Sequence, residues 1–144
     1  MSTGIDRGTM PMASAEVRTV LIEDSRIIRD RLLEVLGQIP NFSVVAQAET
    51  EWEATALLRH ISWEVAILDL QLKEGSGLGV LKEMSRERRP ENSRIIVFTN
   101  FGFPQYRNRC LALGADYFFD KSREFERMRE VLVNISDEAR SIRH

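Results

Sequence analysis

The chain has 144 residues, 43% hydrophobic and 29% charged, with a formal net charge of −2. A domain of this length buries roughly 68–70% of its unfolded surface, enough for a core without covalent staples, and the single cysteine, Cys110, excludes an internal disulfide. No apolar run approaches the ~18 residues of a membrane span, and the charge does not indicate a nucleic-acid-binding surface.

The first 16 residues are rich in Ser, Thr, Gly and Met and lack the basic and apolar regions of a secretory signal. We therefore predict a flexible leader over residues 1–16. The missing signal and the lone cysteine together favour a reducing, cytoplasmic location.

The first apolar run, residues 18–23, predicts a strand. Ser25 then stands at the N-cap of a helix, and Gly37 is expected to close this helix as a C-terminal glycine. Residues 42–46 predict a second strand. Thr50 caps a second helix, with Glu53 completing a capping box.

Residues 64–69 predict the third strand, and the glycine-containing loop 71–77 leads into a third helix marked by Leu78, Leu81 and Met84. The polar stretch 86–92 ends that helix.

Residues 93–99 predict the fourth strand, and residues 104–113 a short fourth helix that Gly114 ends. Residues 115–119 predict the fifth strand. Apolar residues at helical spacing over 125–135 predict a last helix, followed by a polar tail over residues 137–144.

Five strands that alternate with five helices indicate one α/β domain, because right-handed crossovers place helices on both faces of a parallel sheet. We expect a flavodoxin-like, doubly wound five-stranded sheet with strand order 2-1-3-4-5, in which the first and third strands are neighbours.

The chemically reactive residues follow the strands. Glu23 and Asp24 end the first strand, and Asp69 ends the third. Because parallel strands present their carboxyl ends at one edge, these three acids should meet there. Crowded carboxylates repel one another unless a hard cation lies between them, and Mg²⁺ suits such oxygen ligands.

Thr99 and Lys121 arrive at the same edge from the fourth and fifth strands. A carboxylate nucleophile, a metal, a hydroxyl and a lysine fit phosphoryl transfer, which depends on positioning and charge neutralisation. Asp69 stands alone on its strand and is the expected acceptor, while Glu23 and Asp24 are expected to hold the metal.

Over residues 17–135 the chain resembles the receiver domains of two-component response regulators. The motifs are the acidic pair in ValLeuIleGluAspSer, the acceptor in IleLeuAspLeuGlnLeu, the threonine in ValPheThrAsn and the lysine in PhePheAspLysSer. The resemblance implies a receiver domain over residues 17–136.

The resemblance also implies residue roles: Asp69 accepts the phosphoryl group, Gln71 lends its backbone carbonyl to the metal, and Thr99 and Phe118 form the switch. On phosphorylation Thr99 should move toward the phosphoryl group and Phe118 should rotate inward. Glu23 replaces a more usual aspartate and is expected to reach the metal through water.

Under this interpretation the protein is a regulator, with Mg²⁺-dependent self-phosphorylation and self-dephosphorylation as its only chemistry. Its donor would be a histidine kinase or a histidine phosphotransfer protein. An output protein would bind the face formed by residues 104–135, through which a homodimer could also form. Neither membrane nor direct nucleic-acid binding is expected of this domain.

Several alternatives stay open. The chain could be the receiver fragment of a longer DNA-binding transcription regulator, or a degenerate receiver that works without phosphorylation. A dehalogenase-type phosphatase would need a second aspartate two residues after the nucleophile, where this chain has Gln71. A flavodoxin-like cofactor binder would need glycines and hydroxyls where this chain has acids.

Overall fold

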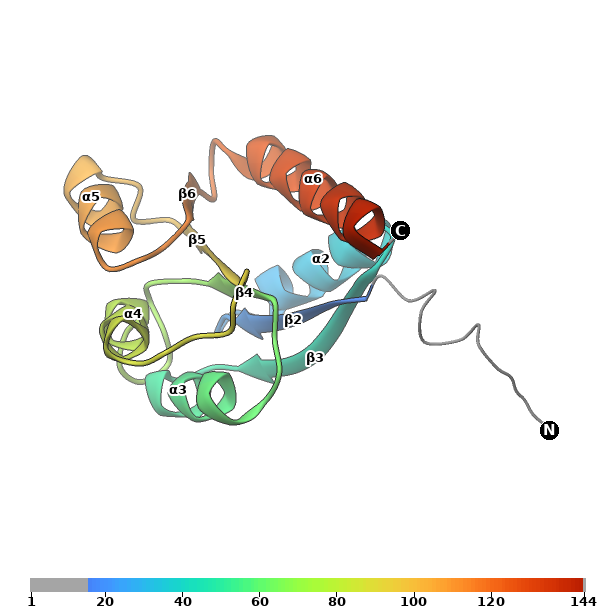
Figure 1. Ribbon diagram of the computed structural model, residues 1–144. Coiled ribbons are helices and arrows are strands. Elements are labelled where there is room, and N and C mark those ends of the chain that lie inside the picture. Colours follow the sequence, from blue (N-terminus) through green and yellow to red (C-terminus); the bar gives the residue numbers. More distant parts are fainter. Residues whose placement is uncertain (1–15, 144) are drawn as a thin grey trace.

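The computed structural model describes residues 16–143 (Figure 1), so the predicted leader falls outside the described residues except for Glu16. Five parallel strands form one sheet in the order β3-β2-β4-β5-β6, which is the predicted 2-1-3-4-5 order. The strands are β2 (Val17–Ile22), β3 (Phe42–Ala48), β4 (Val65–Leu68), β5 (Arg94–Thr99) and β6 (Tyr117–Asp120).

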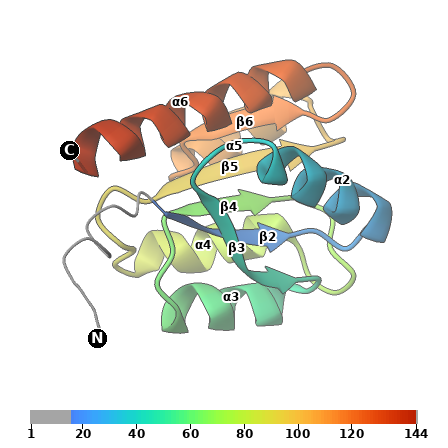
Figure 2. The same ribbon diagram turned by 90° about the vertical axis from the view of Figure 1, so that its right-hand side faces the viewer.

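Helices cover both faces of the sheet, as the doubly wound fold requires (Figures 1 and 2). The helices are α2 (Arg26–Gly37), α3 (Glu51–His60), α4 (Gly77–Arg86), α5 (Pro104–Ala112) and α6 (Phe125–Arg143). One core cluster joins the sheet to α3, α4 and α5, and a second joins it to α2 and α6. Alternate residues of each strand therefore face different cores.

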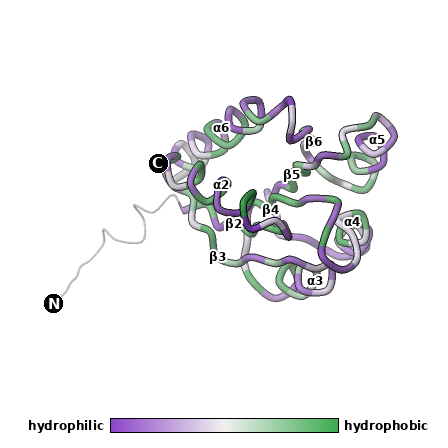
Figure 3. The backbone as a smooth tube through the Cα atoms, turned by 180° about the vertical axis from the view of Figure 1, so that it is seen from behind, coloured by the Kyte–Doolittle hydropathy of each residue, from purple (hydrophilic) through white to green (hydrophobic). Residues whose placement is uncertain are grey.

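The hydropathy of the chain follows this layering: β4 is buried at all four positions, whereas the helices carry both hydrophobic and hydrophilic residues (Figure 3). Trp63, the largest fully buried side chain, packs under α3 and donates its indole N–H to the carbonyl of Leu58 at 3.0 Å. Among residues 16–143, no helix is both long enough and apolar enough to cross a bilayer.

The predicted caps of α2 and α3 are present. Ser25 accepts from the backbone N–H of Ile28, and Thr50 accepts from that of Glu53. The return bond of the capping box differs, because the Glu53 carboxylate accepts from the backbone N–H of Glu49. This bond fixes the turn between β3 and α3.

Gly37 does close α2, as predicted, but without the left-handed conformation that is common at helix ends. Gly37 is the last helical residue, and Gln38 caps the helix in the right-handed conformation. The N–H groups of Gln38 and Ile39 bond back to the carbonyls of Val35 and Leu36, which satisfies the helix end without a left-handed residue. Gly114 after α5 does have a positive φ of 104°.

The segment predicted as a polar tail after residue 136 is helical as far as Arg143. Ser136 explains the extension, because it is buried and its hydroxyl donates to the carbonyl of Pro40 at 2.7 Å. Arg94 also pairs with Glu138 at 2.6 Å, and Ala139 packs against the core. These contacts with β5 and the turn before β3 hold the last turns of α6 on the sheet.

Candidate functional site

The strand register brings the predicted acids together. Ile22 of β2 pairs with Leu68 of β4. Glu23 and Asp69 are the residues that follow these two strands, so they lie level with each other at the carboxyl edge of the sheet. The N–H of Asp69 bonds to the carbonyl of Ile22 at 3.0 Å, which continues the ladder by one step. The acids are therefore placed by the sheet itself.

Lys121 reaches this edge from β6 and contacts both acids. Its Nζ lies 2.8 Å from Oε1 of Glu23 and 2.9 Å from Oδ2 of Asp69. The three side chains are almost fully buried, with 8% of Lys121, 3% of Glu23 and 7% of Asp69 exposed. One ammonium group thus compensates two buried carboxylates, which leaves an excess of negative charge in the site.

The pKa shifts have the signs expected from this imbalance. Burial raises the pKa of Glu23, the charge of Asp69 acts in the same direction, and Lys121 opposes the rise only in part. Burial alone would lower the pKa of Lys121, but its hydrogen bonds and the charges of the two acids outweigh burial and raise it. The site therefore stabilises the charged ammonium of Lys121 and disfavours the negative charge of Glu23 beside that of Asp69.

Asp24 completes an acidic group with Glu23 and Asp69, because one carboxylate oxygen from each lies within 4.8 Å of the other two. Asp24 is half-buried. Glu23 and Asp69 each have a second carboxylate oxygen that does not contact Lys121. Oε2 of Glu23 accepts from the N–H of Ser25 at 3.1 Å, and Oδ1 of Asp69 accepts from the N–H of Leu70 at 2.7 Å. Three converging oxygens with excess negative charge fit a hard divalent cation.

Thr99 lies at the end of β5, fully buried, beside the last residue of β6. Its Oγ1 accepts from the N–H of Phe101 at 3.2 Å, and its carbonyl accepts from the N–H of Lys121 at 2.9 Å. The threonine and the lysine are thus linked through the main chain. Among residues 16–143 no acceptor is found for the Thr99 hydroxyl proton, so the hydroxyl can donate to a new acceptor.

Phe118 is 4% exposed and packs in the core cluster that includes Cys110 and Ala115. Because the ring already lies inside, an inward rotation on phosphorylation would be a repacking within the core. A phenylalanine has no hydroxyl that would favour contact with water, so burial is its preferred state. Gln71 forms an isolated antiparallel bridge with Ser76 just beyond Asp69.

Arg29 is a site residue that the sequence did not reveal. Its Nη1 donates to the carbonyl of Glu23 at 3.0 Å and to Oε2 of Glu49 at 2.6 Å. Only 16% of its side chain is exposed. Arg29 therefore ties α2 to the ends of β2 and β3 and fixes the backbone of the acidic pair.

Gly77, the first residue of α4, is required by a close backbone approach. A Cβ atom at this position would overlap the carbonyl oxygen of Asp69 and contact Cα of Leu70. The N–H of Gly77 also bonds to the carbonyl of Leu70 at 2.9 Å. The start of α4 thus lies directly against the backbone of Asp69 and Leu70.

Comparison with known families agrees with this geometry. The profile described as the response regulator receiver domain matches residues 19–133. The chain belongs to this family. The four strand-end motifs seen in the sequence all lie within the matched residues.

The curated relatives that the chain matches are longer than the chain. A protein-glutamate methylesterase/protein-glutamine glutaminase of Methanospirillum hungatei is 28% identical over 116 residues, covering 80% of this chain and 34% of that protein. Across three curated relatives, the chain spans between 31% and 57% of the relative's length.

Solved structures share the fold at lower identity. The signal receiver domain of a response regulator described as NarL, from Mycobacterium tuberculosis, has a TM-score of 0.74 at 20% identity, covering 85% of this chain and 97% of that one. The Mn²⁺-bound form of the response regulator Rcp1 has a TM-score of 0.70 at 19% identity, covering 84% and 92%.

Proposed function

We propose that this receiver domain is a signalling switch that accepts a phosphoryl group on Asp69. The contact of Lys121 Nζ with the Asp69 carboxylate, at 2.9 Å, carries this proposal. A buried aspartate at a strand end, paired to a lysine and next to a buried threonine hydroxyl, has the parts needed to make and to neutralise an acyl phosphate.

In the proposed reaction, a carboxylate oxygen of Asp69 attacks the phosphorus of a phosphohistidine or a small acyl phosphate. An O–P bond forms at Asp69, the bond from phosphorus to the donor breaks, and the leaving group keeps the electron pair of that bond. The ammonium of Lys121 pairs with one phosphoryl oxygen, and the hydroxyl of Thr99 donates to another. The N–H of Phe101 keeps the threonine oriented at 3.2 Å in the resting state.

We further propose Mg²⁺ as the metal, held by Glu23, Asp24, Asp69 and the backbone carbonyl of Gln71. The convergence of one carboxylate oxygen from each of Glu23, Asp24 and Asp69 within 4.8 Å supports this assignment. When bound, the metal would neutralise charge on the transferred group. Arg29 would support the metal by holding the carbonyl of Glu23 in place.

The proposed donor is a histidine kinase or a histidine phosphotransfer protein, and the proposed location is the cytoplasm. We propose no enzymatic activity beyond self-phosphorylation and self-dephosphorylation. The face formed by α5, β6 and α6 would bind the output partner, which is either another protein or a second copy of this chain in a homodimer. Thr99 ends β5, the strand next to β6, and Asp69 follows β4, which lies one strand further from this face.

Phe118 is proposed as the second switch residue, by repacking within the core rather than by moving into it. It lies on β6 and pairs in register with Val97 of β5, two residues before Thr99. A shift of Thr99 toward a phosphoryl group would open space next to this ring, and α5 would follow because it packs against the same cluster.

Intact-mass measurement tests the central step. The wild-type protein is incubated with Mg²⁺ and acetyl phosphate, with Asp69→Asn and Asp24→Asn as variants. One added phosphoryl group on the wild type, none on Asp69→Asn and a strongly reduced amount on Asp24→Asn is the expected result. No adduct on the wild type would instead favour a degenerate receiver that works without phosphorylation.

A longer DNA-binding regulator is a second candidate architecture, because the chain covers 57% of a curated transcriptional regulatory protein of Bacillus subtilis. The intact mass and the sequence of the protein purified from its native cells would distinguish a single-domain receiver from a longer regulator. A product that extends beyond residue 144 with a basic segment would support this architecture.

A further inference from the structure

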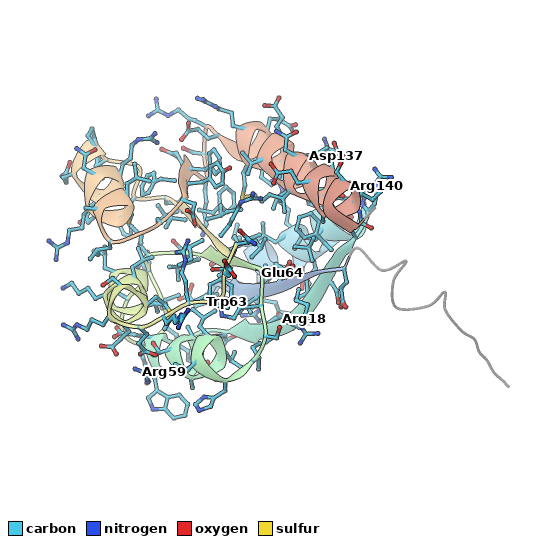
Figure 4. The ribbon with its side chains drawn as sticks, viewed as in Figure 1. Arg18, Arg59, Trp63, Glu64, Asp137 and Arg140 are labelled. Atoms are coloured by element: carbon cyan, nitrogen blue, oxygen red, sulfur yellow. The ribbon has the colours of Figure 1, made fainter. Side chains whose placement is uncertain are left out.

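A groove with a volume of about 510 Å³ lies between α3 and α4, outside the proposed phosphorylation site. Its wall is formed by Glu51, Trp52 and Arg59 from α3, by Glu74 from the loop before α4, and by Glu83 from α4. Figure 4 places Arg59 at the outer edge where the two helices approach each other. The volume is in the range of sites that accept a side chain or a small ligand.

Trp52 presents its ring to solvent at the mouth of the groove. Its exposed fraction is 75%, whereas Trp63 is 1% exposed and donates its indole N–H to a backbone carbonyl. Within residues 16–143, no hydrogen bond or ring contact is found for the Trp52 indole. A large, rigid and unpartnered aromatic face is typical of residues that dominate binding surfaces.

The groove carries more negative than positive charge. Its one cation, Arg59, already pairs with Glu83 at 2.8 Å and with Glu87 at 2.6 Å. Glu51 uses Oε1 to accept from the N–H of Ser76 at 3.0 Å. For the carboxylate of Glu74, no partner is found in the part of the chain that the structure describes. The groove thus combines an exposed aromatic face with a carboxylate for which no partner is found among the described residues.

We propose that this groove binds an arginine side chain of a basic segment in a partner protein. The guanidinium plane would stack on the Trp52 indole, where a cation gains energy from the ring quadrupole. Its N–H groups would form two parallel bonds to the carboxylate of Glu74, a geometry that an ammonium cannot reproduce. Arginine is therefore favoured over lysine. The proposal does not depend on phosphorylation of Asp69.

Nuclear magnetic resonance titration of the ¹⁵N-labelled full chain tests the proposal. The probe is the peptide acetyl-Gly-Arg-Gly-Arg-Gly-amide, with matched peptides that carry lysine or glutamine in place of arginine. The arginine peptide should shift the indole resonance of Trp52 and the amide resonances of Glu74 and Gly75 in a saturable manner. The lysine peptide should bind more weakly, and the glutamine peptide should leave these resonances unchanged.

Three variants sharpen the test. Trp52→Ala should weaken binding of the arginine peptide about fivefold, as expected for loss of one cation–π contact, and Trp52→Phe should recover part of the loss. Glu74→Gln should also weaken binding, whereas Glu126→Gln, an exposed acid on α6, should not. Glu51 is left intact because it holds the start of α4.

Equal shifts from the arginine and glutamine peptides, or unchanged affinity in Trp52→Ala, would overturn the proposal. If the lysine peptide binds as tightly as the arginine peptide, the groove does not recognise the guanidinium group, and this part of the proposal is wrong. Analytical ultracentrifugation tests whether a second copy of the chain occupies the groove instead. A dimer that is present in the wild type and absent in Trp52→Ala would show this and would contradict the proposed partner. Because Trp52→Ala should accept phosphoryl groups like the wild type, failure here is distinct from failure at Asp69.

Discussion

The Nζ of Lys121 lies 2.9 Å from Oδ2 of Asp69, so the lysine contacts the proposed acceptor before any phosphoryl group arrives. The same ammonium also pairs with Glu23. Lysine and acceptor are therefore prepositioned by the sheet, and the negative charge that remains in the site gives a reason for a metal to bind there.

Replacing Lys121 by Gln removes the only ammonium in contact with Asp69 among residues 16–143. We expect the rate of phosphorylation by acetyl phosphate to fall roughly 100-fold, the usual effect of losing one preorganised charge donor. The rate is measured by intact mass over time. Lys82→Gln, an exposed lysine on α4, is the control and should keep the wild-type rate. An unchanged rate in Lys121→Gln would contradict its role.

Arg29→Gln should weaken Mg²⁺ binding about 10-fold, the lower range for loss of a group that orients metal ligands. The reason is that its guanidinium fixes the carbonyl of Glu23. Isothermal titration calorimetry measures the affinity. Arg26→Gln, on the same helix but 85% exposed, should leave the affinity unchanged. If both variants bind Mg²⁺ equally well, Arg29 has no positioning role.

The raised pKa of Glu23 predicts a pH dependence of stability in the metal-free protein. Between the ordinary glutamate pKa and the raised pKa, the folded state binds more protons than the unfolded state. The contribution of Glu23 to the free energy of unfolding should therefore be largest below this window and decline as pH rises through it. Urea denaturation with EDTA measures the decline. Glu23→Gln should lack it, and parallel pH profiles for both proteins would refute the assignment.

Gly77→Ala should destabilise the fold by about 1–3 kcal/mol, because the new methyl group overlaps the backbone at Asp69. Gly37→Ala is the matched control. No atom lies within 4 Å of its added Cβ and its φ is not positive, so a helix-favouring alanine should stabilise by up to about 1 kcal/mol. Urea unfolding curves compare the two, and equal effects would mean that the approach at Gly77 is not constraining.

Cys110 should be inert in the native protein. The residue is fully buried, and burial raises the pKa of its thiol to about 11. Reaction with Ellman's reagent at mildly alkaline pH should be very slow until urea unfolds the chain, and then complete. Fast labelling of the folded protein would show that the packing of α5 opens readily.

The members of the site could be predicted from the sequence because their positions follow from topology. Apolar runs that end in Asp69, Thr99 and Lys121 must meet at one edge once the strands are parallel. The caps at Ser25 and Thr50 and the turn at Gly114 follow from local residue patterns. The strand order could be predicted from the doubly wound fold class that the alternation of strands and helices indicates.

The tertiary structure alone decided which side chains of the site touch. That Lys121 pairs with Glu23 as well as Asp69, that Arg29 holds the acidic pair, and that Phe118 is already buried all depend on distances between elements far apart in the sequence. The length of α6 depends in the same way on the contact of Ser136 with the turn before β3. Periodicity specifies which face of an element is buried, whereas long polar side chains choose partners only when packing fixes what lies within their reach.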